Sequence, residues 1–509
     1  MLNRMTRRVC RLLGGGDIEA GQALLFVLIA LALLMSIPLA IATTTVDQLP
    51  QTTRNLNWDA AYEAAQAGLN DYEQHLDASG SYSVCSKTYT TGCATNSAFT
   101  GWVQASTTPL EYYSYSPSVE TAQGLVSLEV SGKAGSGADA VVRTFAYTVR
   151  PASSLDDVYW TNYESLDPTI SGLPNCPGYT QGEYFGASPA TPGNCTVEFD
   201  SNDTLTGPVF SNDAFRICGT PNFQGTIESG DTLDTAAEWG VAVPGYTNGN
   251  GCGSPPKEAV KIVNNTPPQS AIPATDITAA LKYGCEFTGN VTLALSLSGN
   301  TTHISWSGGT LATPANSFCT SPITLAGSGG MTASLIYAAG TVTVSGNMTG
   351  ALDIMAGQSI IVSNNLQYPS GDIQTGANGE ESDSTDALGL IATDWVQLGT
   401  TSSPVPNLTV DAAILALNDS MYLPNWASVG YERTLTIFGS IAQNFRGPVA
   451  TVNGATVVTG YAKDYIYDTS LQTLWPPYFV PPNSAVWSPT SYEECLAGDN
   501  QSVLNSPNC

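Results

Sequence analysis

The sequence predicts an α+β protein with three parts: an N-terminal transmembrane helix, a small α+β head and a large all-β domain. An apolar run without charge near the N-terminus is followed by a stretch of helical heptad spacing. Beyond about residue 201, short apolar pieces alternate with Gly, Asn, Asp and Ser, a pattern typical of strands and turns. The large domain is predicted to be a parallel β-helix or a related solenoid, with a β-sandwich as the alternative.

Residues 23–42 are predicted to cross a membrane. They contain no charged side chain, and at 1.5 Å per residue they reach about 30 Å, the thickness of the hydrocarbon core. Four arginines lie in the basic leader, residues 1–22, so the positive-inside rule places this end in the cytoplasm. We therefore expect a single-pass protein of the cell membrane with a large extracellular domain. A signal peptide cleaved after Ala42 is the alternative.

Acidic residues dominate the charge of the chain. Of 16 basic residues, the four arginines of the leader leave 12 for the remainder, whereas 43 residues are acidic. A surface of this sign repels phosphate, so we expect no nucleic-acid partner.

The cysteines also point to export. Cys10 precedes the apolar run, and ten cysteines follow it, an even number that would allow all of them to pair. Neighbouring couples of cysteines are candidates for local disulfides, although the spacing does not fix their connectivity. The candidates are Cys85, Cys93, Cys176, Cys195, Cys218, Cys252, Cys285, Cys319, Cys495 and Cys509. Zinc is the weaker alternative, because the chain has no C-x-x-C and only two, widely separated histidines.

Residues 43–80 are predicted to form a stalk helix, separated from the first helix by an end or a bend at Pro50. Its apolar seam has a heptad period, and Ser79-Gly80 stops it. This seam packs either on the helix's own domain or on neighbouring subunits, and the pattern leaves both alternatives open. The helix-packing residues are Trp58, Tyr62, Ala65, Leu69, Tyr72 and Leu76.

The basic leader, Gly21-Gln22-Ala23-Leu24, the apolar helix and the run AYEAAQAGL (residues 61–69) together resemble the N-terminal region of minor type IV pilins of the PilX type. The resemblance implies a membrane helix that enters a filament core, with pilin-like or pilus-assembly proteins as partners. It also implies a role for Glu19 as the pilin-like carboxylate that meets a neighbour's terminal amine. A solvated interfacial charge is the alternative for Glu19.

Residues 81–150 are predicted to complete a small α+β head. Two apolar segments, Leu125–Val130 and Val141–Val149, flank a Gly-rich turn and predict a β-hairpin. The Pro-, Gly- and Asn-rich residues 151–200 are interpreted as an irregular linker.

Residues 201–470 are predicted to form the β-helix-like domain. Inward aliphatic residues recur at rung-like intervals, with Gly and Asn at the corners between them. The order of several motifs resembles exported bacterial proteins with a domain of the DUF4900 type, which implies architecture and surface location. These motifs are GPVFSND, LIYAAG, LGLIATDWV, DAAILAL, GSIAQNFRGPV and GYAKDYIYD. The Pro- and aromatic-rich residues 471–509 are interpreted as a tail that caps the last rung.

No catalytic, nucleotide-binding or metal-binding motif occurs in the sequence, so we expect neither a cofactor nor enzymatic activity. The alternative is a membrane-tethered β-helix enzyme that processes polysaccharides, with Asp394, Asp411, Arg446 and Asp464 as its candidate residues. Asp372 and the acidic segment 376–386 have a composition suited to Ca²⁺, and a solvated surface loop is the alternative there.

Taken together, these patterns predict a non-enzymatic, membrane-anchored surface protein with a structural or assembly role. Its β-rich ectodomain is expected to be displayed outside the cell and to take part in adhesion to a surface ligand.

Overall fold

The computed structural model covers residues 1–509, and its secondary structure is described for part of them. Side chains are not described for residues 20–27 and 32–52 or for a few strand ends. The described ranges are 20–78, 82, 85, 96–120, 125–151, 153–171, 197–213, 215, 220–229, 261–263, 284–313, 319, 322–326, 334–369, 374–375, 381–382, 386–400, 404–453, 456–472, 474–479 and 487–495.

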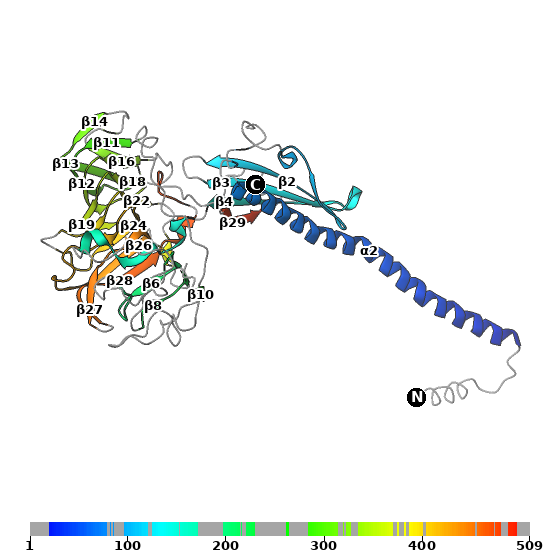
Figure 1. The fold of residues 1–509 in the computed structure, drawn as a ribbon. Helices are drawn as coiled ribbons and strands as arrows, with labels where there is room; N and C mark the ends of the chain where they lie inside the picture. Colours follow the sequence, from blue (N-terminus) through cyan, green and yellow to red (C-terminus); the bar gives the residue numbers. More distant parts are fainter. Residues whose placement is uncertain are drawn as a thin grey trace.

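One long helix, α2 (Ala20–Ala78), begins the described chain. Its 59 residues correspond to about 90 Å, and Figure 1 shows that much of it projects away from the β regions. Of the two alternatives predicted at Pro50, an end of the helix is wrong, because the helix continues through Pro38 and Pro50. A proline inside a helix removes one backbone hydrogen bond and its ring crowds the preceding turn, and the helix continues past both prolines despite this cost.

The predicted membrane span, residues 23–42, falls largely among residues whose side chains are not described. Among the described residues, no helix combines the length and the hydropathy that a membrane crossing requires. Glu19 lies outside the described residues.

The C-terminal part of α2 packs on a small antiparallel sheet, and together they form the head (Figure 1). The strand order is β1-β2-β3-β4-β29, and β3 pairs with β4 as the expected hairpin. Single turns of 3-10 helix flank the sheet. The strands and turns are β1 (Val103–Thr107), β2 (Leu110–Glu120), β3 (Leu125–Ala134), β4 (Val141–Pro151), β29 (Trp487–Glu494), η2 (Ser97–Phe99), η3 (Gly137–Asp139) and η4 (Ser154–Asp156).

The remaining β-structure is a large mixed sheet that curls into a half-barrel, and parallel pairing dominates it. Its first ladder is parallel throughout, unlike the antiparallel sheets of a β-sandwich. In spatial order its strands are β11 (Gly284–Thr288), β16 (Ser334–Ala338), β18 (Ala351–Ala356), β22 (Ala387–Ala392), β24 (Thr409–Ala416), β26 (Tyr431–Arg446), β5 (Tyr159–Leu166), β7 (Val209–Ser211), β9 (Thr226–Ser229) and β10 (Lys261–Val263).

A second parallel ladder forms the neighbouring part of the curled sheet. It joins β12 (Val291–Leu297), β17 (Val342–Asn347), β19 (Ile360–Gln367), β23 (Val396–Leu398) and β25 (Met421–Tyr422). From β19 it also passes through β24 and β26 to β28 (Thr456–Tyr467), β6 (Thr204–Thr206) and β8 (Asn222–Phe223).

Short antiparallel strands and turns complete the domain, and those at the β11 end pair with β11 and β12. The additional elements are β13 (Thr301–Ser307), β14 (Thr310–Thr313), β15 (Ile323–Ala326), β20 (Gln374–Thr375), β21 (Glu381–Ser382), β27 (Ala450–Asn453), α3 (Pro168–Ser171) and η5 (Thr469–Gln472).

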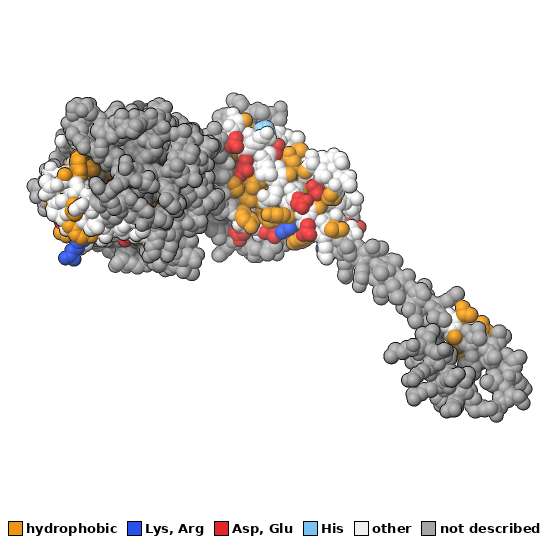
Figure 2. Space-filling model, turned by 60° about the horizontal axis from the view of Figure 1, so that its bottom comes forward, with side chains coloured by type: hydrophobic (Ala, Val, Ile, Leu, Met, Phe, Trp, Pro, Cys, Tyr) orange, Lys and Arg blue, Asp and Glu red, His pale blue; other side chains and the backbone are white. Residues whose placement is uncertain are grey.

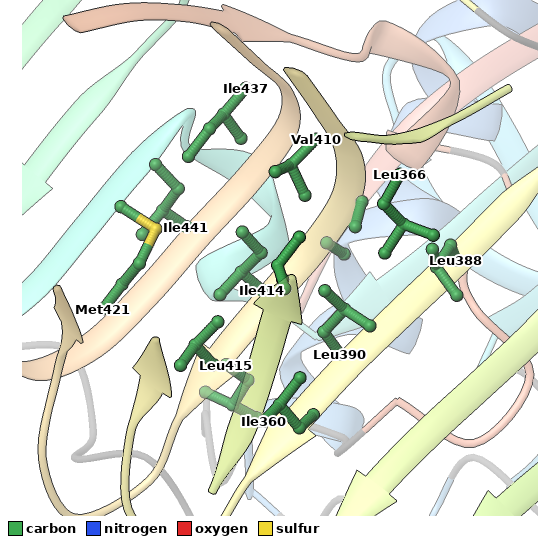
Figure 3. Close-up of a cluster of buried hydrophobic side chains, with 14 of the residues drawn as sticks. Ile360, Leu366, Leu388, Leu390, Val410, Ile414, Leu415, Met421, Ile437 and Ile441 are labelled. Atoms are coloured by element: carbon green, nitrogen blue, oxygen red, sulfur yellow. The ribbon is translucent and has the colours of Figure 1, made fainter. Parts of the chain in front are cut away.

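The core of the large sheet consists of residues that stand in register on successive parallel strands. Ile354 pairs with Leu390, Leu390 with Ile414, and Ile414 with Ile441, and all four are fully buried. Figure 3 shows Leu390, Ile414 and Ile441 within this core. The aliphatic positions that the sequence singled out as rung-like obey the same rule, because Val342 pairs with Ile360 and both are buried. Burial of each such side chain contributes about 1.5–3 kcal/mol.

The strand order of the large sheet departs from the order of the chain. Strands β5–β10, here called the N-terminal stack, follow the head, and the chain then continues at β11, the far end of the sheet. Strands β11–β28, the C-terminal stack, wind back until β26 pairs with β5 and β28 pairs with β6. We call this junction between the two stacks the seam. Residues 159–166, expected within an irregular linker, form β5 at this seam because nearly all of their side chains are buried there.

The C-terminal tail connects the large sheet to the head. The side chain of Trp475 is buried under the guanidinium of Arg150, 5.2 Å from the ring centre. The buried carboxylate of Asp353 accepts the backbone N–H of Tyr478 at 2.6 Å. Residues 487–494, expected within a cap on the last rung, pair instead with β4 as the outer strand of the head sheet.

Candidate assembly surface

Small residues seat α2 on the head sheet. A Cβ atom on Gly132 would lie 1.9 Å from the carbonyl oxygen of Ala61 and 2.4 Å from the amide nitrogen of Ala65. At Gly68, on the helix itself, a Cβ would lie 2.8 Å from Val130 of β3. Helix and sheet therefore approach until backbone meets backbone, which only glycine and alanine permit at these positions.

The predicted helix-packing residues divide into two groups. Ala65, Leu69, Tyr72 and Leu76 are buried on the head's own sheet, so this part of the seam is covered within the chain. Trp58 and Tyr62 remain 45% and 37% exposed. The buried positions near them are taken by alanines, because the close approach at Gly132 excludes larger side chains and leaves Trp58 and Tyr62 at the flank.

Arg143 of β4 holds this flank together. Its guanidinium lies 4.8 Å from the ring centre of Trp58 and 5.4 Å from that of Tyr62. It also donates two hydrogen bonds to Glu494 of β29, at 2.7 and 2.8 Å. The hydrogen bond from Arg143 holds the pKa of Glu494 below its usual range, and the same bond raises the pKa of Arg143. This one side chain therefore connects the helix, the hairpin and a strand from the far end of the chain.

Several exposed apolar side chains surround this arginine or lie farther along the same elements. Figure 2 shows hydrophobic side chains interleaved with acidic ones on one face of the head. We call this set the assembly surface because it joins residues of the projecting helix α2 to residues of β4 and β29. Its members are Leu56, Trp58, Tyr62, Val142, Arg143 and Tyr492.

A polar network inside the head connects the helix α2 to the sheet. The hydroxyl of Tyr115 donates to Asp71 at 2.9 Å, and Asn96 donates to the hydroxyl of Tyr82 at 3.1 Å. Burial and the nearby Asp71 raise the pKa of Tyr113 to about 12. Burial and the neighbouring Asp77 raise the pKa of Glu73 to about 7. This network is structural, because Asp71, Tyr82, Asn96 and Tyr115 are hydrogen-bonded to one another.

The four candidate residues of a glycan-processing enzyme have separate structural partners. Asp411 of β24 accepts the backbone N–H of Tyr368 at 2.9 Å, and Asp464 stands opposite Thr204 in the β28–β6 ladder. Arg446 is buried and donates to Glu164 at 2.6 Å. Asp394 lies beside Asp419, where its charge contributes to raising the pKa of the latter carboxyl group. The described contacts therefore assign the four residues to different places in the sheet.

The seam contains a buried ionic cluster that the sequence analysis missed. Arg446 faces Glu164 and lies 3.7 Å from the ring centre of Phe199, and Lys463 donates to Asp203 at 2.6 Å. Burial lowers the pKa of Arg446, but the charges of Glu164 and Tyr159 and the hydrogen bond to Glu164 together outweigh burial and raise that pKa. Burial and the neighbouring Asp203 raise the pKa of Asp200 to about 6. A lone arginine in a strand pattern gave no signal of its partner, which lies 282 residues away.

Among the ten candidate cysteines, Cys285 and Cys319 form a disulfide with an S–S distance of 2.08 Å. Cys85 and Cys495 are also disulfide-bonded, to partners outside the described residues. The other candidates, Cys93, Cys176, Cys195, Cys218, Cys252 and Cys509, lie outside the described residues as well.

Most of the acidic segment 376–386 and Asp372 also lie outside the described residues. Within the described ranges, no three His, Cys, Asp or Glu side chains are grouped as ligands of a metal ion.

Comparison with solved structures finds distant similarities. No family model matches the chain, and no curated protein is significantly similar to it. The crystal structure of the competence-associated pilin ComZ from Thermus thermophilus is similar over 86% of this chain and 96% of that chain, with 12% identity and a TM-score of 0.28. A similarity at this TM-score carries no weight in the assignment of fold or function.

Proposed function

We propose that this chain is a pilus-associated structural protein, in which α2 is the assembly element and the β regions are the displayed body. The observation that carries the proposal is the length of α2 compared with the shorter part of it that the head sheet covers. Only its C-terminal part packs on the head sheet, and the helix continues well beyond the head (Figure 1). An isolated helix gains little stability in water from propensity alone, so the projecting part requires a covering of lipid or of other helices.

The exposed side chains of the projecting part support this proposal. Leu28, Ile29 and Leu31 are 56%, 48% and 46% exposed, and the sequence around them contains no charge. Apolar surface of this extent on a helix is typical of a segment that is buried in a membrane or among neighbouring helices. The assembly surface on the head extends this apolar character up to Tyr62 and Arg143.

The finer parts of the proposal follow from the sequence. We propose a minor-pilin-like protein with a single membrane pass, its N-terminus in the cytoplasm, and pilin-like or pilus-assembly proteins as partners. The large sheet, interpreted as a parallel β-helix, would then be displayed outside the cell and contact a surface ligand. The parallel ladders and their in-register core support that interpretation.

A glycan-processing enzyme is not favoured by any specific observation. Asp411 and Arg446 are buried and engaged within the sheet, and the contacts of Asp394 and Asp464 lie on other strands. We therefore propose a non-enzymatic role.

The test is to make the projecting helix polar without touching the head. In cells that produce the full chain, Leu28→Asp combined with Leu31→Asp should release the protein from the membrane fraction and from purified pili. Each aspartate costs about 2.5–3.5 kcal/mol at the centre of a membrane helix, so retention should fall by more than tenfold. Cell fractionation and immunoblotting of sheared pili measure both losses.

The matched control is Gln74→Asp, which places one new carboxylate on an exposed position of the same helix beside the head. It should leave retention unchanged. Full membrane and pilus association of the double variant would overturn the proposed function.

A further inference from the structure

The seam carries a second polar contact, on the surface side of the ionic cluster. Helix α3 follows β5 and brings Thr169 to the loop after β24, where Asp419 lies. Asp167, which precedes α3, is fully buried and accepts hydrogen bonds from the hydroxyl of Ser420 at 2.8 Å and from the backbone N–H of Thr169 at 2.8 Å. The contact therefore joins the N-terminal stack to the C-terminal stack.

The hydroxyl of Thr169 has one proton to donate, but two carboxyl groups lie within its reach as acceptors. It lies within hydrogen-bonding reach of Asp167 Oδ1, at 3.2 Å from Asp419 Oδ1, and at 3.2 Å from the indole nitrogen of Trp395, which donates to it. A hydroxyl donates one hydrogen bond and accepts two. When it donates to Asp167, the contact with Asp419 is a hydrogen bond only if Asp419 itself carries a proton.

Within the part of the chain that the structure describes, no basic side chain forms an ion pair with either carboxyl group. Among the described residues, neither Asp167 nor Asp419 forms an ion pair, and the nearest base along β26, Arg446, is engaged with Glu164. The other titratable groups that face them are Asp394, whose charge acts on Asp419, and Tyr422 of β25, on which Asp167 acts. Asp419 is only 8% exposed, so water does not screen the pair effectively.

We propose that Asp167, Thr169 and Asp419 form a pH-sensitive clasp across the seam, in which a proton on Asp419 completes a chain of hydrogen bonds from Asp419 through Thr169 to Asp167. Acid closes the clasp. At neutral pH, Asp419 loses its proton, one hydrogen bond is replaced by the repulsion of two carboxylates, and the two stacks are held less firmly together.

The electrostatics of the site support the direction of this effect. Burial, with the charge of Asp167 as the next cause, raises the pKa of Asp419 to about 6, and this outweighs the lowering effect of a hydrogen bond donated by Thr169. A raised pKa in the folded state adds stability that is fully present below the ordinary pKa of an aspartate and is lost as the pH rises through about 6. The clasp is therefore closed near pH 4 and open above pH 7.

The test measures opening at the seam with hydrogen exchange. In the full chain, amide exchange of β5 and of the segment 417–422, corrected for the intrinsic effect of pH, should be about tenfold slower at about pH 5 than at about pH 7.5. Asp419→Asn keeps a donor toward Thr169 at every pH. It should therefore make exchange at about pH 7.5 as slow as that of the wild type at about pH 5.

Two further variants make the result specific. Thr169→Val removes the bridging hydroxyl and should speed exchange at about pH 5 while changing little at about pH 7.5. Glu432→Gln removes one negative charge elsewhere on β26 and should preserve the wild-type pH dependence. Equal seam exchange at both pH values in the wild type, or an Asp419→Asn variant that exchanges as fast as the wild type at about pH 7.5, would overturn the clasp.

Discussion

In the head and at the seam of the large sheet, strands that are distant in sequence pair with each other. The two junctions differ in how far their ion pairs are exposed to water. In the head, β29 pairs with β4, and the Arg143–Glu494 ion pair has side-chain exposures of 13% and 27%. At the seam, β26 pairs with β5, and the Arg446–Glu164 pair has side-chain exposures of 2% and 0%. The head junction is therefore partly screened by water, whereas the seam junction depends on complete pairing of its charges.

At both junctions, a basic residue forms the contact between the distant segments, although the chain has few basic residues. Arg143 and Arg446 each join strands from distant parts of the chain. Lys463 joins β28 to Asp203 of the N-terminal stack, and Arg150 lies between Asp156 and the tail residue Trp475. Local strand pairs along the C-terminal stack are held instead by aliphatic residues in register. These four basic residues thus lie at contacts between segments that are distant in sequence.

The largest expected effect comes from breaking the seam pair. Arg446→Met leaves Glu164 buried without its cation and should lower the free energy of unfolding of the large sheet by about 3–5 kcal/mol. Urea unfolding, followed by hydrogen exchange of β26 and β5, measures the loss. The double variant Arg446→Met with Glu164→Gln should recover part of it, and a double variant as unstable as the single one would contradict an electrostatic origin.

A smaller effect of opposite sign is expected where the tail crosses the sheet. Burial raises the pKa of Asp353 to about 7, and its Oδ1 atom has no hydrogen-bond partner among the described residues. The protonated form is favoured in the folded state, so its stabilisation is present at about pH 4 and is lost as the pH rises through about 7. Asp353→Asn should therefore gain about 2–4 kcal/mol at about pH 8 and nothing at about pH 4. Urea midpoints at the two pH values measure this, and an equal change at both would refute it.

The close contact of helix and sheet sets the next prediction. Gly132→Ala places a methyl group against the backbone of Ala61, so α2 must shift and the head should lose about 1–3 kcal/mol. Thermal unfolding followed by the fluorescence of the head's tryptophans checks it. Gly101→Ala is the matched control, since no atom lies within 4 Å of its added Cβ, and it should leave the head's stability nearly unchanged.

The smallest effect is expected at the exposed junction of the head. Glu494→Gln should cost less than about 1 kcal/mol at neutral pH and low salt, because this pair is partly screened. Because the pKa of Glu494 is lowered, the stabilisation by the ion pair is lost as the pH falls through that pKa. For Asp353, by contrast, stabilisation is lost as the pH rises. Unfolding at low and high salt, at about pH 7 and about pH 3, would show it, and an effect independent of both would refute the ion pair as its cause.

Part of this organisation could be predicted from residues alone. The helix, the hairpin from β3 to β4 and the recurring aliphatic positions of the large domain depend on local spacing, which a sequence displays directly. The partial exposure of Trp58 and Tyr62 could not be predicted, because it depends on how closely Gly132 lets the helix approach. The position of β29 in the head sheet was missed for a similar reason, since a Pro-containing segment carries no mark of its distant partner strand.

The amino-acid sequence by itself determined the acidic balance, the helical character of the N-terminal region and the mostly β character, because each depends on composition and on local periodicity. Only the tertiary structure decided the order of the strands, the placement of β5 against β26, and the pairing of Arg446 with Glu164. Such choices depend on which of many similar strand edges meet, and that is fixed by the joint packing of segments hundreds of residues apart.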